Sequence, residues 1–359
     1  MKSALRHSAL ILLLSTLLFP LSAVAAPPED ASISAECAIL IEATTGRVLY
    51  AKNADKRHAM ASTTKIMTAL VAAESMPLDA VISVDPRAVG VEGSSVYLTA
   101  GQRYTLEALL HALLLQSAND AAEAIAYAIA GSVPAFAERM NERAATLGLT
   151  ATHFENPHGL DGDTHFTTAS ELAFIAKEAM AHPALAEIFA KRRYIFASLE
   201  GENARTLINH NKMLVLYDGA VGVKTGYTKR CGRCLVSAAE RDGLSLIAVT
   251  LDAPSDWSDH RALLDYGFLT YESRLLAAAG EIALTIPLFN AEGTATVVNS
   301  EEIRLSLPKD APAPTVTYDL FPLPVTPVRD GALAGYVTYT AEDGTAITSP
   351  LIYTTEKKS

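Results

Sequence analysis

Several features that mark common protein classes are scarce or missing in this sequence. Its 359 residues include 29 Lys and Arg against 40 Asp and Glu, which gives a net charge of -11, and no block of Lys and Arg forms a basic stripe. A nucleic-acid-binding function is therefore disfavoured, because such proteins present a basic patch to the phosphates. Beyond the N-terminal region, no hydrophobic run is long enough to span a membrane. What remains is a chain of about two domains' length, half of it hydrophobic, with ample material for packed cores.

Cysteine is also rare, which limits both disulfides and metal sites. The three cysteines are Cys37, Cys231 and Cys234, and the last two lie in the sequence CGRC. A zinc site would need two further ligands at suitable spacing, which the neighbouring sequence does not offer. A redox pair is expected at a helix N-terminus, whereas this pair falls in a turn between strand-like runs. We interpret the pair as ordinary thiols or an incidental disulfide, and we expect no metal and no cofactor.

The first 25 residues have the composition of an export signal. Lys2 and Arg6 form a charged head, a short apolar run follows, and small residues precede a cleavage point after Ala25. The apolar run is too short for a retained membrane span. We predict an exported protein on the cell-wall or periplasmic side, soluble or peripherally bound to the membrane. No transmembrane anchor is predicted, and the C-terminal apolar run is too short for an amphipathic membrane helix.

The rest of the sequence divides into a mixed region and an all-β region. Apolar runs around ATTG predict a β-hairpin over 37–53, and a helix is predicted at 61–75. From 278 onward, short alternating runs separated by Pro and Gly predict a β-sandwich. The expected domains are a signal peptide at 1–25, a main domain at 26–277 and a β-sandwich domain at 278–359. Within the main domain, further helices are predicted at 105–115, 120–130, 133–147, 170–181 and 256–267, and strands at 220–228, 234–243 and 244–253.

The first candidate for chemistry is the pair Ser62 and Lys65, at the start of the 61–75 helix. Residues three apart on a helix share a face, so the amine and the hydroxyl can meet. A desolvated lysine that faces other cations can accept the serine proton, and the free N–H groups of the helix start can bind an oxyanion. The alternative is that Ser62 caps the helix and Lys65 reaches solvent. The pattern is weak alone, since Ser306 and Lys309 match it in a strand-like region that contains proline.

Two further patterns offer side chains that could share a cleft with this pair. Ser117 and Asn119 lie in the short link between two apolar helices, where a hydroxyl and an amide could point into a cleft together. The alternative for Asn119 is that it is the N-cap of the following helix. Lys224, Thr225 and Gly226 lie on a strand-like run whose edge could pair with a peptide. A glycine at this position allows a close approach of the substrate.

In the order Ser-x-x-Lys, Ser-x-Asn, Lys-Thr-Gly, these motifs resemble the active-site set of penicillin-binding proteins and serine β-lactamases. Their flanking sequences are similar to those of the low-molecular-mass D-Ala-D-Ala carboxypeptidases over about residues 36–268. The resemblance implies a mixed α/β (α+β) fold of the β-lactamase/transpeptidase type, with an antiparallel sheet flanked by helices. The catalytic domain would be 26–277, and the C-terminal β-sandwich also fits this family.

The resemblance further implies a serine acyl transfer on peptidoglycan stem peptides. Ser62 would attack the carbonyl between the two terminal D-alanines, and Lys65 would accept its proton. The oxyanion would be bound by the backbone N–H groups of Ser62 and Tyr227, and Ser117 and Lys224 would relay the proton to the departing D-alanine. Water would then release the shortened peptide, and β-lactam antibiotics would acylate the same serine. The expected substrate-binding residues are Asn119, Lys224, Thr225, Gly226 and Tyr227.

Two departures from the family pattern are visible in the sequence. Some relatives bind the substrate carboxylate with an Arg before the last helix, whereas this chain offers Arg261 in a slightly different place, so that role stays unassigned. Cys231 stands in the turn after Lys-Thr-Gly, where a small residue is expected. We expect no catalytic role for His158 or His210, and packing explains His158.

Three other functions compete with the carboxypeptidase. A β-lactamase of the same fold needs rapid deacylation, and the E-x-x-L-N segment associated with it is missing between residues 120 and 223. A DD-endopeptidase that cuts crosslinks between stems would use the same nucleophile, and the sequence does not distinguish it. A non-catalytic wall-binding scaffold is disfavoured because all the motif residues are intact.

Overall fold

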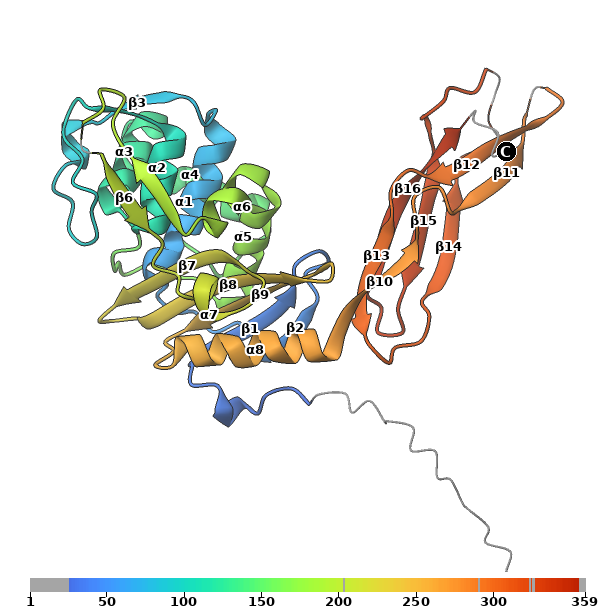
Figure 1. The fold of residues 1–359 in the computed structure, drawn as a ribbon, viewed down its shortest axis with the longest axis horizontal. Helices are drawn as coiled ribbons and strands as arrows, with labels where there is room; N and C mark the ends of the chain where they lie inside the picture. The colour runs from blue at the N-terminus through green and yellow to red at the C-terminus, as the bar shows by residue number, and fades with distance from the viewer. Residues whose placement is uncertain (1–25, 203, 290, 323, 325–326, 355–359) are drawn as a thin grey trace, which may run out of the picture.

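The computed structural model describes residues 26–202, 204–289, 291–322, 324 and 327–354. They form a mixed part of helices and strands, followed by an all-β part that extends away from it (Figure 1). The predicted signal peptide at 1–25 lies outside the described residues. No helix in the described part of the chain is long and apolar enough to cross a membrane.

A five-stranded antiparallel sheet is the centre of the first part. Its strand order is β2-β1-β9-β8-β7, and every neighbouring pair is antiparallel. The predicted hairpin is β1 (Cys37–Glu42) and β2 (Val48–Lys52). The three later strands are β7 (Ala220–Thr228), β8 (Gly232–Arg241) and β9 (Leu244–Leu251). Strand β7, which carries the Lys-Thr-Gly motif, therefore forms one edge of the sheet, as a peptide-binding strand requires.

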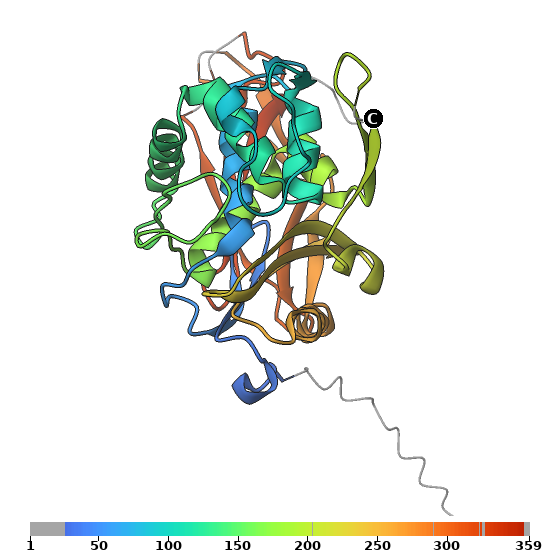
Figure 2. The same ribbon diagram turned by 90° about the vertical axis from the view of Figure 1, so that its left-hand side faces the viewer.

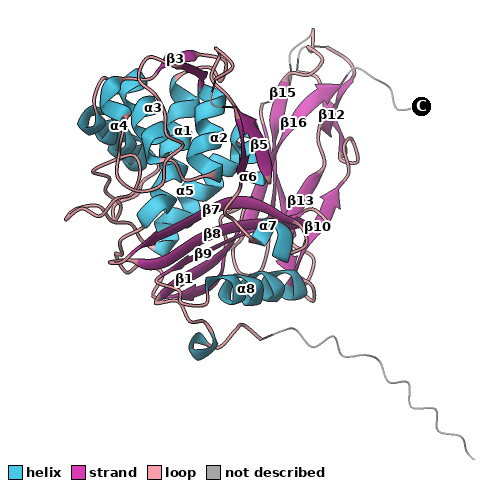
Figure 3. Ribbon diagram, turned by 60° about the vertical axis from the view of Figure 1, so that its left-hand side comes forward, coloured by secondary structure: helices cyan, strands magenta, loops and turns pink. Residues whose placement is uncertain are grey.

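Helices cover both faces of this sheet because its strands are apolar on both sides. In β1, Ile39 and Ile41 face the larger helical group, whereas Ala38 and Leu40 pack with α8 (Asp256–Thr270). Figures 1 and 3 show α8 on one face and α1 to α6 on the other, and Figure 2 shows α8 end on below the sheet. The other helices are α1 (Lys65–Ser75), α2 (Leu106–Leu115), α3 (Asn119–Ala130), α4 (Val133–Thr146), α5 (Ala169–Ala181), α6 (Pro183–Ala190) and α7 (Met213–Leu216).

Small elements surround this core, and the sequence did not predict most of them. Two-stranded sheets pair β3 (Val81–Ser83) with β4 (Arg103–Thr105) and β5 (Arg193–Phe196) with β6 (Arg205–Ile208).

The predicted helix at 61–75 is confirmed, although its first turn is a 3-10 helix, η2 (Ala61–Thr64). The helices predicted at 105–115, 120–130, 133–147, 170–181 and 256–267 are confirmed as α2, α3, α4, α5 and α8.

The C-terminal part is a β-sandwich, as predicted. The two-stranded sheet β10-β13 packs against the five-stranded sheet β11-β12-β16-β15-β14. Residues from both sheets share one core, among them Ala277, Ile303, Val297, Val337 and Leu351. The strands are β10 (Tyr271–Ala277), β11 (Ala283–Pro287), β12 (Thr294–Asn299), β13 (Ile303–Pro308), β14 (Thr315–Leu320), β15 (Leu333–Thr340) and β16 (Ala346–Thr354).

Strand β10 bears on the position of the domain boundary. The sequence predicted the boundary between residues 277 and 278, which assigns 271–277 to the first domain. In the structure β10 pairs with β13 over its whole length, so these seven residues belong by pairing to the sandwich. The boundary at 277/278 stays a prediction, and strand pairing offers a second position before Tyr271.

Candidate active site

Ser62 lies in the 3-10 turn η2, directly before α1. Close backbone contacts shape this turn. Ala61 has a φ of 46°, in the left-handed region. A Cβ on Gly159 would lie 1.9 Å from the carbonyl oxygen of Ala61, and a Cβ on Gly226 would lie 3.1 Å from the backbone nitrogen of Ser62. Glycines on two other segments thus allow the backbone to close around the serine.

Lys65 is fully buried beside this serine. Its Nζ lies 2.9 Å from Ser62 Oγ, 2.7 Å from Asn119 Oδ1 and 2.6 Å from the carbonyl oxygen of His158. Burial, and after it the neighbouring Lys224, lowers the pKa of Lys65 well below its usual range. A neutral amine at this distance can accept the proton of the hydroxyl. The alternative in which Lys65 reaches solvent is wrong.

Asn119 connects Lys65 to a neighbouring loop. It is the first residue of α3, but the N-cap position is Ala118, which makes no side-chain cap hydrogen bond. The amide oxygen of Asn119 accepts from Lys65, and its amide nitrogen donates to the carbonyl oxygen of Glu92 at 2.6 Å. The N-cap alternative for Asn119 is therefore wrong. Gly93 fits tightly against this amide, because a Cβ there would lie 2.7 Å from Nδ2.

The loop that contains Glu92 is held over the site by the residue after Asn119. The buried carboxylate of Asp120 accepts hydrogen bonds from the backbone nitrogens of Val96 and Leu98 at 3.1 and 2.9 Å, and from Ser95 Oγ at 2.6 Å. The sequence analysis did not identify Asp120. An acidic residue at the start of a predicted helix is common, so nothing in the sequence indicated that it holds a distant loop.

Ser117 and the Lys-Thr-Gly strand complete the site. Ser117, with a φ of 59°, lies between α2 and α3 and is buried. Lys224 is also buried, and this burial lowers its pKa to about 7. Its Nζ donates to the carbonyl oxygen of Thr225 at 2.9 Å. Tyr227, two residues further along the edge strand, is exposed.

A cavity of about 380 Å³ joins these elements. Five of the predicted site residues line it, whereas Lys65, Asn119 and Lys224 lie buried behind them. The lining also includes residues that sequence reasoning missed or dismissed, because they come from four segments that are distant in the sequence. The lining residues are Ser62, Ser94, Ser117, His210, Lys212, Thr225, Gly226, Tyr227, Arg233, Asp256 and Trp257.

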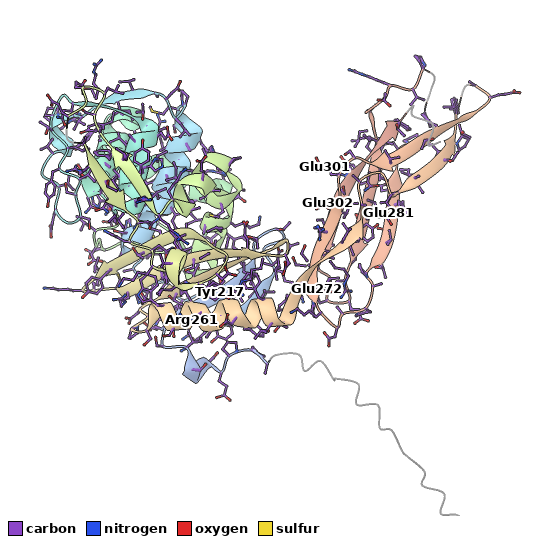
Figure 4. The ribbon with its side chains drawn as sticks, in the orientation of Figure 1. Tyr217, Arg261, Glu272, Glu281, Glu301 and Glu302 are labelled. Carbon is purple, nitrogen blue, oxygen red and sulfur yellow. The ribbon has the colours of Figure 1, made fainter. Side chains whose placement is uncertain are left out.

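The sequence also singled out His158, His210 and Arg261 without assigning a role to any of them. The His158 ring is buried with Nε2 3.4 Å from Glu123, and burial lowers its pKa; only its backbone carbonyl contacts Lys65. His210 lines the cavity, and burial lowers its pKa as well. Arg261 lies exposed on α8 and does not line the cavity (Figure 4).

The cysteine pair lies in the turn after the Lys-Thr-Gly strand. Cys231 and Cys234 are buried free thiols with their sulfurs 3.9 Å apart. The thiol of Cys234, followed by the hydroxyl of Thr228, lowers the pKa of Cys231 to about 6. The pair therefore occurs as thiols here, which is one of the two states that the sequence interpretation allowed.

One group of described residues has the composition of a metal site, and it lies outside the cavity. A carboxylate oxygen of Glu36, a ring nitrogen of His58 and a carboxylate oxygen of Asp252 lie within 4.8 Å of one another. The ammonium of Lys56 already forms an ion pair with Glu36, and His58 Nε2 lies 3.4 Å from the same carboxylate. These two side chains satisfy Glu36 without a metal ion.

The chain is similar in sequence and in structure to known proteins. Residues 22–255 match a family model described as D-alanyl-D-alanine carboxypeptidase. The chain is 34% identical over 250 residues to D-alanyl-D-alanine carboxypeptidase DacF of Bacillus subtilis, a match that covers 67% of this chain and 64% of DacF. It is 36% identical over 238 residues to D-alanyl-D-alanine carboxypeptidase DacB2 of Mycobacterium tuberculosis, with 64% of this chain and 81% of DacB2 covered. The chain thus spans less than two thirds of the DacF length.

Solved structures extend the similarity to the C-terminal part. Penicillin binding protein 5 from Haemophilus influenzae superposes with a TM-score of 0.72 at 25% identity, over 92% of this chain and 98% of that chain. The peptidoglycan synthesis regulatory factor PBP3 from Streptococcus pneumoniae superposes with a TM-score of 0.78 at 26% identity, over 90% of this chain and 98% of that chain. Both matches include the sandwich as well as the mixed part, so the predicted fold class is confirmed.

Proposed function

The chain belongs to the D-alanyl-D-alanine carboxypeptidase family of serine peptidases, and from this premise we propose that it removes the terminal D-alanine from peptidoglycan stem peptides. The reaction runs through an acyl-enzyme on Ser62. The observation that carries the proposal is the buried amine of Lys65, 2.9 Å from the Ser62 hydroxyl and with a lowered pKa. Burying an amine is costly, and a buried amine with a lowered pKa is suited to take a proton.

The proposed steps follow from the positions of the side chains. Ser62 Oγ forms a bond to the carbonyl carbon between the two D-alanines, and its proton passes to Lys65 Nζ. The backbone N–H groups of Ser62 and Tyr227 stabilise the negative oxygen of the tetrahedral intermediate. The C–N bond then breaks, and the departing D-alanine amine takes a proton that Ser117 and Lys224 relay. Water attacks the remaining ester, releases the shortened peptide and restores the Ser62 hydroxyl.

The proposal has three further parts, which concern the inhibitors, the location and the substrate-binding residues of the protein. A β-lactam presents a strained amide that Ser62 opens in the same way, so penicillins act as covalent inhibitors. The substrate lies in the wall, so the protein works outside the cytoplasm, on the cell-wall or periplasmic side. Asn119, Thr225 and Gly226 bind the substrate, since they lie in or directly behind the cavity.

Release of D-alanine tests this function. The mature protein is mixed with a synthetic peptide that ends in L-Lys-D-Ala-D-Ala, and free D-alanine is measured beside the Ser62→Ala variant. We expect release by the wild type and none by the variant. If the protein leaves this peptide intact but cleaves crosslinked muropeptide dimers, it is an endopeptidase instead. Equal release by both proteins would overturn the assignment of Ser62.

A further inference from the structure

The cavity must hold an anion if the proposed function, on which this inference rests, is correct. A carboxypeptidase acts next to a free C-terminal carboxylate, and a buried carboxylate needs a cationic partner. Lys65 and Lys224 are poor partners, because burial lowers the pKa of both and they are engaged in moving protons. The guanidinium of arginine stays charged and presents paired donors that match a carboxylate. Of the residues that line the cavity, only Arg233 is an arginine.

The register of the sheet places Arg233 next to the substrate-binding strand. Arg233 on β8 lies directly opposite Tyr227 on β7. Opposite residues on antiparallel strands point to the same face, and so do residues two apart on one strand. Thr225, Tyr227 and Arg233 therefore share one face of the sheet at its free edge, and all three line the cavity that contains Ser62. A peptide that lies along β7 would bring its last residue toward this group.

A buried carboxylate holds the guanidinium in place. Arg233 Nε donates to Asp256 Oδ2 at 3.0 Å, and the Asp256 side chain is 5% exposed against 46% for Arg233. Asp256 is the first residue of α8, where a carboxylate is favourable, and its Oδ1 accepts from the backbone nitrogen of Trp257 at 2.9 Å. Among the described residues, Asp256 is the only hydrogen-bond partner of the guanidinium. The two terminal nitrogens of Arg233 are thus left for a ligand.

We propose that Arg233 is the substrate-binding residue that anchors the C-terminal carboxylate, with Asp256 as its positioning residue. The terminal nitrogens of Arg233 form a two-point contact with the carboxylate beside Thr225. Lys212 lines the same cavity. The positive charges of Lys212 and Arg233 therefore outweigh the single negative charge of Asp256 in the cavity lining. Arg261 does not fill this role, because it lies outside the cavity. The binding arginine therefore comes from strand β8 and not from the segment before α8.

A pair of substrates tests the anchor. One is the peptide that ends in L-Lys-D-Ala-D-Ala with a free carboxylate, and the other is the same peptide with a C-terminal amide. We expect the wild type to prefer the acid by ~10- to 100-fold in kcat/KM, the range for a hydrogen bond to a charged group. Arg233→Gln should lose that preference by slowing the acid alone, whereas the matched variant Lys212→Gln should keep most of it. Arg233→Lys should recover part of the preference, because it restores the charge without the paired donors.

Asp256→Asn tests the positioning role separately. This variant should raise KM for the acid more than it lowers kcat, and it should leave the amide unchanged. A merely structural effect would reduce turnover of both substrates together. Unchanged preference in Arg233→Gln, or loss of the preference in Lys212→Gln alone, would overturn the anchor.

The failure of the anchor can be told apart from the failure of the proposed function. If the wild type releases neither D-alanine nor D-alaninamide, acylation by benzylpenicillin and by its methyl ester replaces hydrolysis as the readout. Faster acylation by the free acid that disappears in Arg233→Gln would support the anchor while refuting the carboxypeptidase. No acylation by either compound would overturn both.

Discussion

Lys65 shows how the surroundings of a single residue define its chemistry. A buried, charged lysine is costly, and in such a place the group shifts its pKa instead. In the proposed reaction the lowered pKa is useful, because the neutral amine lies beside the hydroxyl that would lose a proton. The sequence predicted this pair and its role as a hypothesis, and it also offered a second pair of the same spacing, Ser306 and Lys309, which lies on and next to β13.

Substitution of Lys65 and of Lys309 tests which of the two Ser-x-x-Lys matches has a role in catalysis. Lys65→Met keeps the apolar stem and removes the amine, so D-alanine release should fall by ~10²- to 10⁴-fold, the usual contribution of a general base. Lys309→Met, the control, should leave the rate unchanged, because exposed Lys309 only donates to the carbonyl oxygen of Phe268. Steady-state kinetics at one pH measure both. Equal rates for Lys65→Met and the wild type would show that Lys65 is not the base.

The activity should depend on pH in a bell shape. Below its lowered pKa Lys65 is protonated and cannot accept a proton, so kcat/KM should rise with pH through that value. Above the pKa of Lys224, about 7, the relay loses its proton and kcat/KM should fall. The two lysines interact, so the measured limbs belong to the pair. Lys224→Arg, which stays charged, should move the falling limb to higher pH, and an unmoved limb would exclude Lys224 as its origin.

The limits of sequence reasoning at this scale have a physical cause. Ser62, Lys65 and the Lys-Thr-Gly residues carry local patterns, so the sequence revealed them. The local sequence at Asn119 favoured a helix cap, and only its contact with Lys65 in the structure decided against that interpretation. Arg233 and Asp256 are 23 positions apart and meet only because β8 and the start of α8 lie together, which no short pattern records.

The element that positions Ser62, the proposed nucleophile, is the η2 turn together with the loop that packs on it. Gly159 has a φ of 87° and lies against Ala61, so it needs both freedom of the backbone and the absence of a side chain. Gly148, with a φ of 75°, has nothing within 4 Å of its Cβ position. These two glycines share a conformation and differ in their contacts.

Gly159→Ala should therefore cost more than Gly148→Ala. Both substitutions strain the backbone, which costs of order 1–3 kcal/mol of the free energy of unfolding. Only Gly159→Ala also displaces the Ser62 turn, so acylation by penicillin should slow by up to ~10²-fold. Thermal unfolding and acylation rates measure the two effects. Equal acylation rates in both variants would mean that the contact with Ala61 does not position the serine.

Long, periodic elements were the ones that the sequence predicted correctly. The hairpin, six helices and three sheet strands were recognised because their apolar faces repeat over many residues. Strands β3 to β6 are three or four residues long, which is too short to show a period. Helix α6 is also short, and it begins at a proline close behind the end of α5. Strand β10 was missed because it follows α8 without a break.

At the scale of the whole molecule, two parts with separate cores meet around α8 and β10. The buried residues of the cores on both faces of the large sheet all precede β10, although Tyr271 at the start of β10 packs against the core on the α8 side. Contacts between the parts include two polar ones, in which Arg47 pairs with Asp343 at 2.6 Å and Lys309 donates to the carbonyl oxygen of Phe268 at 2.9 Å, and an edge-to-face contact between the rings of Tyr266 and Tyr271. The composition shift near residue 278 indicated two parts, but it did not indicate to which of them strand β10 belongs.

Truncation locates the boundary between the parts. A protein of residues 26–270 should be monodisperse and should react with penicillin as the full chain does, since its cores are complete. A protein of residues 26–277 should aggregate more readily, because β10 loses its partner β13 and exposes an unpaired strand. Light scattering and acylation compare the two proteins. Better behaviour of 26–277 would restore the boundary at 277/278.

The most direct test of the account is the identification of the residue that penicillin acylates. The mature protein is treated with benzylpenicillin, its intact mass is measured, and the modified peptide is mapped in the wild type, in Ser62→Ala and in Ser306→Ala. We expect one added penicillin on Ser62 in the wild type and in Ser306→Ala, and none in Ser62→Ala. Modification at another residue, or undiminished labelling of Ser62→Ala, would contradict it.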